Sequence, residues 1–162
     1  MINNGTMEIG TEGHPYKSKL TITMHGKKYD PAMPIFGKKS LGIMRGTLDI
    51  HGVHKTSWTD LDTTVEQGDS QLTLVEETNW EAGDRIMITS TDYDQYQAEF
   101  FTVLSNTIDG GKSTITIDGA FSHRHYAAVE QHGADTLTIR AEVCLMSRNI
   151  VFRGDPETSA KN

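Results

Sequence analysis

The sequence lacks several features that would assign it quickly to a class of protein. Its 162 residues include one cysteine, Cys144, so no disulfide can form within the chain. Cys144 lies in an apolar stretch and is expected to be a buried, unreactive thiol. No run approaches the roughly 20 apolar residues that cross a bilayer, so no membrane-spanning segment is expected. The first residues have neither a basic segment nor an apolar core, so no signal peptide is expected there.

An excess of positive charge is also missing. The chain has 22 acidic and 15 basic residues and a formal net charge of −7. This balance argues against nucleic acid as a partner, although a local basic groove can still bind an acidic polysaccharide. With 36% hydrophobic and 23% charged residues, the composition is that of a folded protein. We expect one domain over residues 1–154, followed by a polar tail or a link to a further domain at residues 155–162.

Apolar residues alternate with polar ones throughout the chain, which is the pattern of half-buried strands. Five segments show it most clearly: 20–25, 47–51, 84–89, 113–118 and 136–140. Their apolar residues are expected to share one core, namely Ile22, Met24, Leu48, Ile50, Ile86, Ile88, Ile115, Ile117, Leu137 and Ile139. The best helical candidate is residues 58–67, and less than a tenth of the chain is expected to be helical. Residues 109–112, with the sequence Asp-Gly-Gly-Lys, predict a hairpin or tight turn.

Four strand patterns end in a polar residue followed by glycine, at Gly26, Gly52, Gly119 and Gly154. Glycine there lets the chain turn with a positive φ. Recurrent strand–glycine units are expected of a β-solenoid, in which each coil stacks on the one before it. Because the spacing of these glycines is irregular, a β-sandwich remains an alternative.

Several longer motifs, in order along residues 6–154, resemble the G-eight domain family. This family, named for its eight glycines, occurs in hyaluronan-binding cell-surface proteins and in fibrocystin-like proteins. The resemblance rests on residues 20–26, 33–37, 48–52, 56–59, 84–99 and 140–151. Cys144 stands where the family usually has glycine, and Ser147 where it usually has threonine.

The resemblance implies an all-β, right-handed parallel β-helix of short stacked strands and an extracellular or cell-surface location. It also implies a link to hyaluronan binding or depolymerisation, and to calcium in some members, but it does not assign cleavage to this chain. No cofactor is expected to be required, although calcium binding is open. At a secreted location, Asn4-Gly5-Thr6 would be an acceptor for N-glycosylation at Asn4.

The most concentrated cationic and aromatic segment is His123-Arg124-His125-Tyr126. Arg124 can pair with a sugar carboxylate, and Tyr126 can stack on a sugar ring, so these four residues are candidate ligand-binding groups. The alternative is a simple loop between strands. Two further aromatic residues, Trp58 and Trp80, are interpreted as core anchors in preference to platforms for sugars.

Two pairs of polar residues share a strand face and are further candidates. Asp92 and Asp94 flank Tyr93 and could bind calcium, or could simply lie in a solvated loop. Asp49 and His51 form the second candidate pair, for a ligand, and stacking of coils could align His51 with His25. The alternative for the histidines is a polar ladder on a wet face.

Two functions remain open from the sequence. The first is an extracellular carbohydrate-associated module that binds, or helps to process, an acidic polysaccharide such as hyaluronan. The second is a non-catalytic structural or adhesion module of a larger surface protein or fibre. Open ends of a solenoid expose unpaired strand edges, which would stack with further β-helix domains or with copies of the chain.

Overall fold

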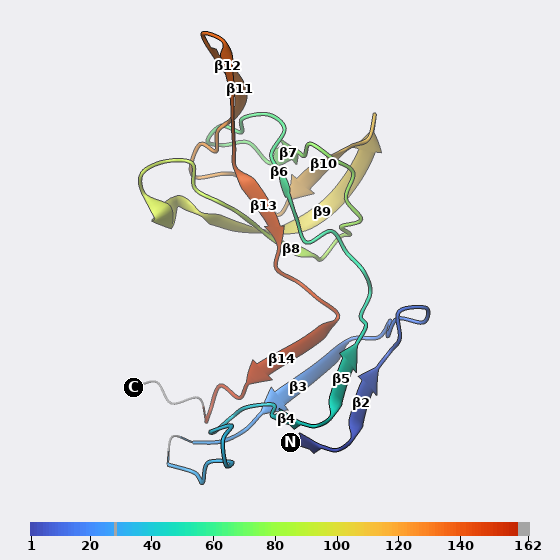
Figure 1. Cartoon of the computed structure of the whole chain (residues 1–162). Helices are drawn as coiled ribbons and strands as arrows, with labels where there is room; N and C mark the ends of the chain where they lie inside the picture. The colour runs from blue at the N-terminus through green and yellow to red at the C-terminus, as the bar shows by residue number, and fades with distance from the viewer. Residues whose placement is uncertain (28, 159–162) are drawn as a thin grey trace. The chain divides into compact units, whose positions relative to one another are not determined.

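The computed structural model describes residues 1–27 and 29–158, which form two compact units (Figure 1). Unit 1 comprises the described residues of 1–54 and 148–158, and unit 2 comprises residues 55–147. Within these residues the regular structure consists of fourteen strands and one 3-10 helix, η1 (Gln95–Gln97). The all-β prediction is therefore confirmed.

Unit 1 consists of strands paired two by two. β1 (Ile2–Asn3) pairs with β4 (Ile43–Met44), β2 (Thr6–Ile9) with β5 (Thr47–Ile50), and β3 (Leu20–Met24) with β14 (Ile150–Gly154). All three pairs are parallel. Residues 155–158 remain attached to unit 1, because the N–H of Asp155 donates to the carbonyl of Met24 at 2.9 Å. Residues 159–162 of the expected polar tail lie outside the described residues.

Asn149 and Gly52 hold three segments of unit 1 together. The Asn149 amide nitrogen donates to the carbonyls of Tyr16 and Ser18, at 2.6 and 3.1 Å, and its amide oxygen accepts from the N–H of Val53 at 2.9 Å. A Cβ atom on Gly52 would lie 2.6 Å from that oxygen. Position 52 therefore requires glycine because any side chain would clash with Asn149, and not because of its backbone conformation, since Gly52 does not have a positive φ. Of the four strand-ending glycines, Gly26 alone has the expected positive φ, at 144°.

Unit 2 is built on a six-stranded antiparallel sheet. In sheet order the strands are β6 (Trp58–Asp60), β13 (Glu142–Leu145), β8 (Arg85–Ile88), β9 (Glu99–Asp109), β10 (Lys112–Ile117) and β7 (Gln71–Thr73). A bridge between Leu61 and Leu74 connects the chain after β6 with the chain after β7, with backbone hydrogen bonds of 2.7 and 3.0 Å beside it. The two ends of the sheet order are thus joined, and the sheet closes on itself around its core.

A separate hairpin extends from this sheet, formed by β11 (Ala127–His132) and β12 (Asp135–Arg140) (Figure 1). The predicted turn at residues 109–112 is confirmed as the link between β9 and β10. Gly110 and Gly111 there have φ values of 58° and 79°, which two-residue hairpin turns require.

The prediction of a right-handed parallel β-helix is wrong. The six-stranded sheet and the hairpin are antiparallel throughout, and the parallel pairs of unit 1 have two strands each, so the described residues form no closed solenoid. The physical reason is that alternation specifies which face of a strand is buried but not the direction of its neighbour. The β-sandwich alternative is not observed either, because unit 2 has one sheet closed on itself.

The core of unit 2 confirms part of the predicted apolar set. Ile86, Ile88, Ile115 and Ile117 are buried together with Leu61, Val65, Leu72, Leu74, Trp80, Val103, Phe121, Ala127, Ala141, Val143 and Leu145. The four predicted core residues of unit 1, Ile22, Met24, Leu48 and Ile50, are only half-buried.

Three sequence expectations are corrected here. Leu137 and Ile139 are 47% and 36% exposed, because a hairpin of two strands has no third layer to cover it. Residues 58–67, the best helical candidate, are not helical, since this segment begins with β6 and continues without helix. Cys144 is half-buried instead of buried; burial, and then the charge of Glu142, raise the pKa of its thiol, which agrees with low reactivity.

Candidate ligand-binding sites

Arg124 and Tyr126 lie together at a hollow in the surface of unit 2. The Arg124 guanidinium carbon is 5.0 Å from the centre of the Tyr126 ring, within the range of a cation–π contact. The hollow has a volume of about 430 Å³ and is also lined by Thr91, Asp92 and Ile139. Two of the predicted ligand-binding residues and one predicted metal ligand are therefore brought to one place.

Hydrogen bonds to carboxylates hold both side chains of this hollow. The Nε of Arg124 donates to Glu66 Oε1 at 3.0 Å, and the hydroxyl of Tyr126 donates to Glu130. The bond to Glu130 raises the pKa of Tyr126, and the same bond lowers the pKa of Glu130. The phenol therefore stays protonated and Glu130 stays charged at neutral pH. Any anionic ligand of Arg124 must compete with Glu66.

His125 is not available to a ligand, because its side chain is fully buried. Its ring nitrogens face two acceptors: Nδ1 is 2.8 Å from the carbonyl of Thr89, and Nε2 is 3.1 Å from Glu99 Oε2. The expectation that His125 binds a ligand is therefore replaced by a structural role beneath the hollow.

Glu99 is the residue of this region that the sequence did not single out. Its carboxylate, 12% exposed, accepts from the backbone N–H groups of Ser122 and His123, at 2.8 and 3.0 Å, as well as from His125. Burial alone would raise the pKa of Glu99, but these hydrogen bonds outweigh burial and the pKa is lowered. Glu99 lies opposite buried Ile88 in β8, which places its carboxylate on the inward face, and the sequence contains no signal for this pairing.

Asp92 and Asp94 accept hydrogen bonds from the backbone of their own loop. Asp92 Oδ1 accepts from the N–H of Tyr93 at 2.6 Å, and Asp94 Oδ1 accepts from that of Tyr96 at 2.9 Å, at the start of η1. Within residues 1–27 and 29–158, no group of three or more histidine, cysteine or acidic side chains could hold a metal ion. Calcium binding at this pair stays a prediction.

Asp49 and His51 contact each other in unit 1, with 2.7 Å between Oδ1 and Nε2. His51 does not stack with His25, since β3 and β5 belong to different strand pairs. His25 instead lies 3.3 Å from Asp155. Asn4 is exposed with a φ of 52°, so its side chain is accessible for modification.

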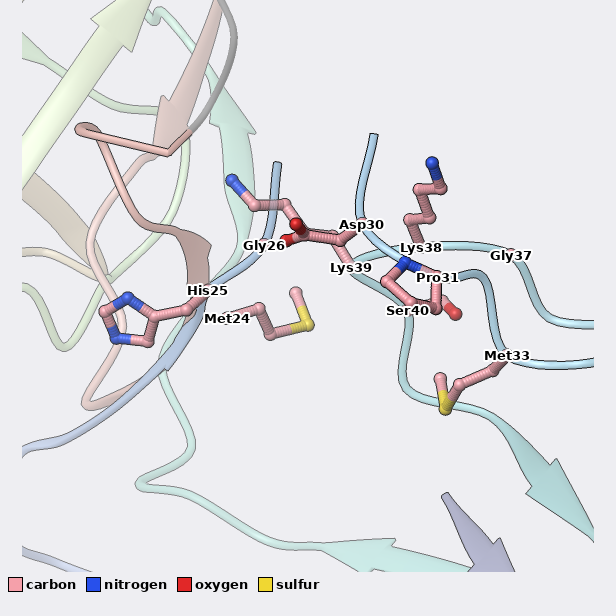
Figure 2. Close-up of a pocket in the computed structure, with 10 residues that line it drawn as sticks. All are labelled: Met24, His25, Gly26, Asp30, Pro31, Met33, Gly37, Lys38, Lys39 and Ser40. Carbon is pink, nitrogen blue, oxygen red and sulfur yellow. The ribbon is translucent and has the colours of Figure 1, made fainter. Parts of the chain in front are cut away.

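Unit 1 has a second hollow that the sequence did not predict (Figure 2). Its volume is about 390 Å³, and its lining includes His25, Asp30, Lys38 and Lys39. Figure 2 shows Lys39 beside Asp30 and Gly26, and a Cβ atom on Gly26 would lie 3.4 Å from Lys39 Cγ. The adjacent Lys38 and Lys39, directly after the family-like stretch 33–37, were the available signal for a basic lining here.

The structure thus defines a small all-β module with two open hollows, one in each unit. Residues 1–62 match the G8 domain, which is the G-eight domain of the resemblance above.

Relatives align over most of the chain. Mouse and human fibrocystin-L are 37% and 35% identical over 94% and 99% of it. The cell surface hyaluronidase of Danio rerio is 40% identical over 50% of the chain. The chain spans only about 4% of either fibrocystin-L and 6% of the hyaluronidase. Among solved structures, the tailspike gp61 of Pseudomonas phage phi297 aligns with 93% of this chain and 22% of its own, at a TM-score of 0.45 and 17% identity.

Among the described residues, no helix has the length and apolar character needed to cross a membrane.

Proposed function

We propose that this chain is a carbohydrate-binding module of a cell-surface or secreted protein, and that it binds an acidic polysaccharide without cleaving it. The observation that carries the proposal is the Arg124 guanidinium held over the Tyr126 ring at the edge of an open hollow. An arginine can pair with a sugar carboxylate in bidentate fashion, while an aromatic ring can stack on the adjacent sugar. The name of the Danio rerio relative, cell surface hyaluronidase, makes hyaluronan the first ligand to test.

The competing carboxylates set the expected strength of binding. Glu66 already pairs with Arg124, and Asp92 lines the same hollow. A polyanion must displace or share these contacts in solvent, where ion pairs contribute little and are screened by salt. Binding is therefore expected to be weak and to decrease as the ionic strength rises.

Replacing Arg124 tests this proposal. Calorimetry with hyaluronan fragments should give saturable heat for the unaltered chain, and Arg124→Ala should weaken binding by up to about fivefold, since an exposed ion pair contributes about 0.2–1 kcal/mol. Arg153→Ala is the matched control, because this exposed arginine bonds to Thr23 in unit 1, outside the hollow. No heat at millimolar ligand, or equal binding by Arg124→Ala, would contradict the proposal.

A structural or adhesion module is the second candidate function, and the strand pairs of unit 1 favour it. Each described strand of this unit has a single strand neighbour, so each has one edge that pairs with no other strand. Such edges can pair with another chain. Sedimentation in the absence of saccharide tests this candidate. An average molecular mass that rises with protein concentration would show self-association and would support this candidate over the first.

A further inference from the structure

The outward face of the six-stranded sheet carries a row of apolar side chains that crosses four strands. Trp58 in β6 lies opposite Cys144 in β13, Cys144 lies opposite Met87 in β8, and Met87 lies opposite Phe100 in β9. Directly opposed residues of antiparallel strands point to the same face. The neighbours along these strands, such as Val143, are buried, so this row points away from the core.

The two ends of the row are large aromatic side chains that the fold leaves in solvent. Trp58 is 56% exposed and Phe100 is 53% exposed. No residue in the described part of the chain accepts a hydrogen bond from the Trp58 indole N–H. The Trp80 indole, in contrast, is buried and donates to the carbonyl of Thr56 at 2.8 Å. The interpretation of both tryptophans as core anchors therefore holds for Trp80 and is wrong for Trp58.

The geometry of the row suits an extended saccharide lying across the strands. Adjacent strands are about 4.8 Å apart, so the three steps from Trp58 to Phe100 separate the two side chains by about 14 Å. Between them lie Cys144 and Met87, which are half-buried and lack rings. A pyranose ring has a face of C–H groups that can lie flat on an aromatic ring, and two such platforms would hold two sugars of one short oligosaccharide.

Polar groups on either side of the row indicate the charge of the saccharide. Asp60 and Glu142 lie opposite each other on one side of the row. Arg85 lies on the other side of the row, where it interacts electrostatically with Asp118. Carboxylates accept hydrogen bonds from sugar hydroxyls but repel uronate or sulfate groups. The surroundings of the row are thus more acidic than basic, which favours an uncharged sugar.

We propose that this face, the Trp58–Phe100 row, is a second saccharide site, which binds a neutral polysaccharide by stacking on Trp58 and Phe100. It shares no residue with the Arg124 hollow and does not depend on it. The chain would then contact a glycan at a charged site and at an uncharged one.

The test is a titration of the full chain with two neutral probes, the β-1,4-linked N-acetylglucosamine hexamer and cellohexaose. Trp58 is solvent-exposed, so its fluorescence should change on binding at least one probe. Trp58→Ala and Phe100→Ala should each weaken binding by about three- to tenfold, the contribution of one aromatic contact. Tyr93→Ala, which removes another fully exposed ring, and Arg124→Ala should bind as the unaltered chain does. Raising the salt concentration should have little effect.

Three results would overturn this site. The first is no saturable binding of either hexamer at millimolar concentration. The second is an affinity of Trp58→Ala and Phe100→Ala for the hexamers equal to that of the unaltered chain, with thermal melting showing that both variants are folded. The third is a dimer, detected by sedimentation, that Trp58→Ala abolishes, because the face would then be a protein interface. Hyaluronan binding that depends on Arg124 would persist in all three cases, so failure here is separable from failure of the proposed function.

Discussion

Replacing Glu99 by glutamine is expected to lower the free energy of unfolding by about 1–3 kcal/mol, the usual cost of leaving a buried hydrogen-bond donor without a partner. The Glu99 carboxylate accepts three hydrogen bonds, two from backbone N–H groups and one from the fully buried ring of His125. Glutamine has one acceptor oxygen in place of two, and its NH₂ group cannot accept the proton of His125 Nε2. A buried donor would be left without a partner.

The matched control is Glu66→Gln. Glu66 accepts a hydrogen bond from Arg124 at 3.0 Å, but its side chain is 62% exposed, so the same change should cost less than about 1 kcal/mol. Urea unfolding of both variants measures the difference. His125→Asn should resemble Glu99→Gln, and the double variant should lose less than the sum, because both changes remove one contact. Equal stability of Glu99→Gln and Glu66→Gln would contradict this account of the pair.

The same pair predicts how stability depends on pH. The pKa of Glu99 is lowered in the folded chain from its ordinary value of 4.5, so the unfolded chain binds a proton at higher pH than the folded chain does. The contribution of Glu99 to stability is complete at a pH above its ordinary pKa, and it is lost as the pH falls through its lowered pKa in the folded chain. When the pH is lowered from 5 to 3, the free energy of unfolding of Glu99→Gln should therefore decrease by less than that of the unaltered chain, as measured by urea unfolding at each pH. Some acid sensitivity should remain, because the pKa of Asp84 is also lowered.

Ile88→Ala is expected to destabilise the chain by about 2–5 kcal/mol through loss of buried apolar surface and formation of a cavity. Ile88 lies in β8 between β13 and β9, opposite Val143 and Glu99, and is fully buried. Packing on both sides limits how far the core can collapse into the space.

Leu137→Ala is the control for Ile88→Ala. The alternating pattern places both residues in predicted strands, but Leu137 is 47% exposed on the β11–β12 hairpin, so its loss should cost less than about 1 kcal/mol. Chemical unfolding followed by tryptophan fluorescence compares them. A loss for Leu137→Ala as large as that for Ile88→Ala would mean that the hairpin is covered in solution.

Much of the local structure could be predicted because its causes are local. Alternation of Thr with Ile in residues 113–118 specifies a strand with one buried face, and Asp109-Gly110-Gly111-Lys112 specifies a tight turn, since these glycines adopt positive φ. The G8 match over residues 1–62 also follows from the order of residues alone. The absence of a helical stripe likewise predicted the all-β class.

The candidate site was predicted only in part, because burial depends on what packs above each strand. Arg124 and Tyr126 are accessible, as expected, but His125 points inward to Glu99, a residue far from it in the sequence. Alternation along residues 123–126 allowed for opposite faces without saying which face was covered. The prediction for Trp58 erred in the opposite direction, since this aromatic residue was expected in the core but lies exposed on the outer face of the sheet.

The sequence by itself thus determined strands such as β3, β8 and β10, the turn between β9 and β10, and the match of the first 62 residues to the G8 domain. Tertiary structure alone decided that β13 inserts between β6 and β8, that the larger sheet is antiparallel, and that Glu99 meets His125. The physical reason is that strand propensity and turn geometry are properties of neighbouring residues. Strand direction and burial arise instead from contacts between distant segments, whose free energy no local pattern contains.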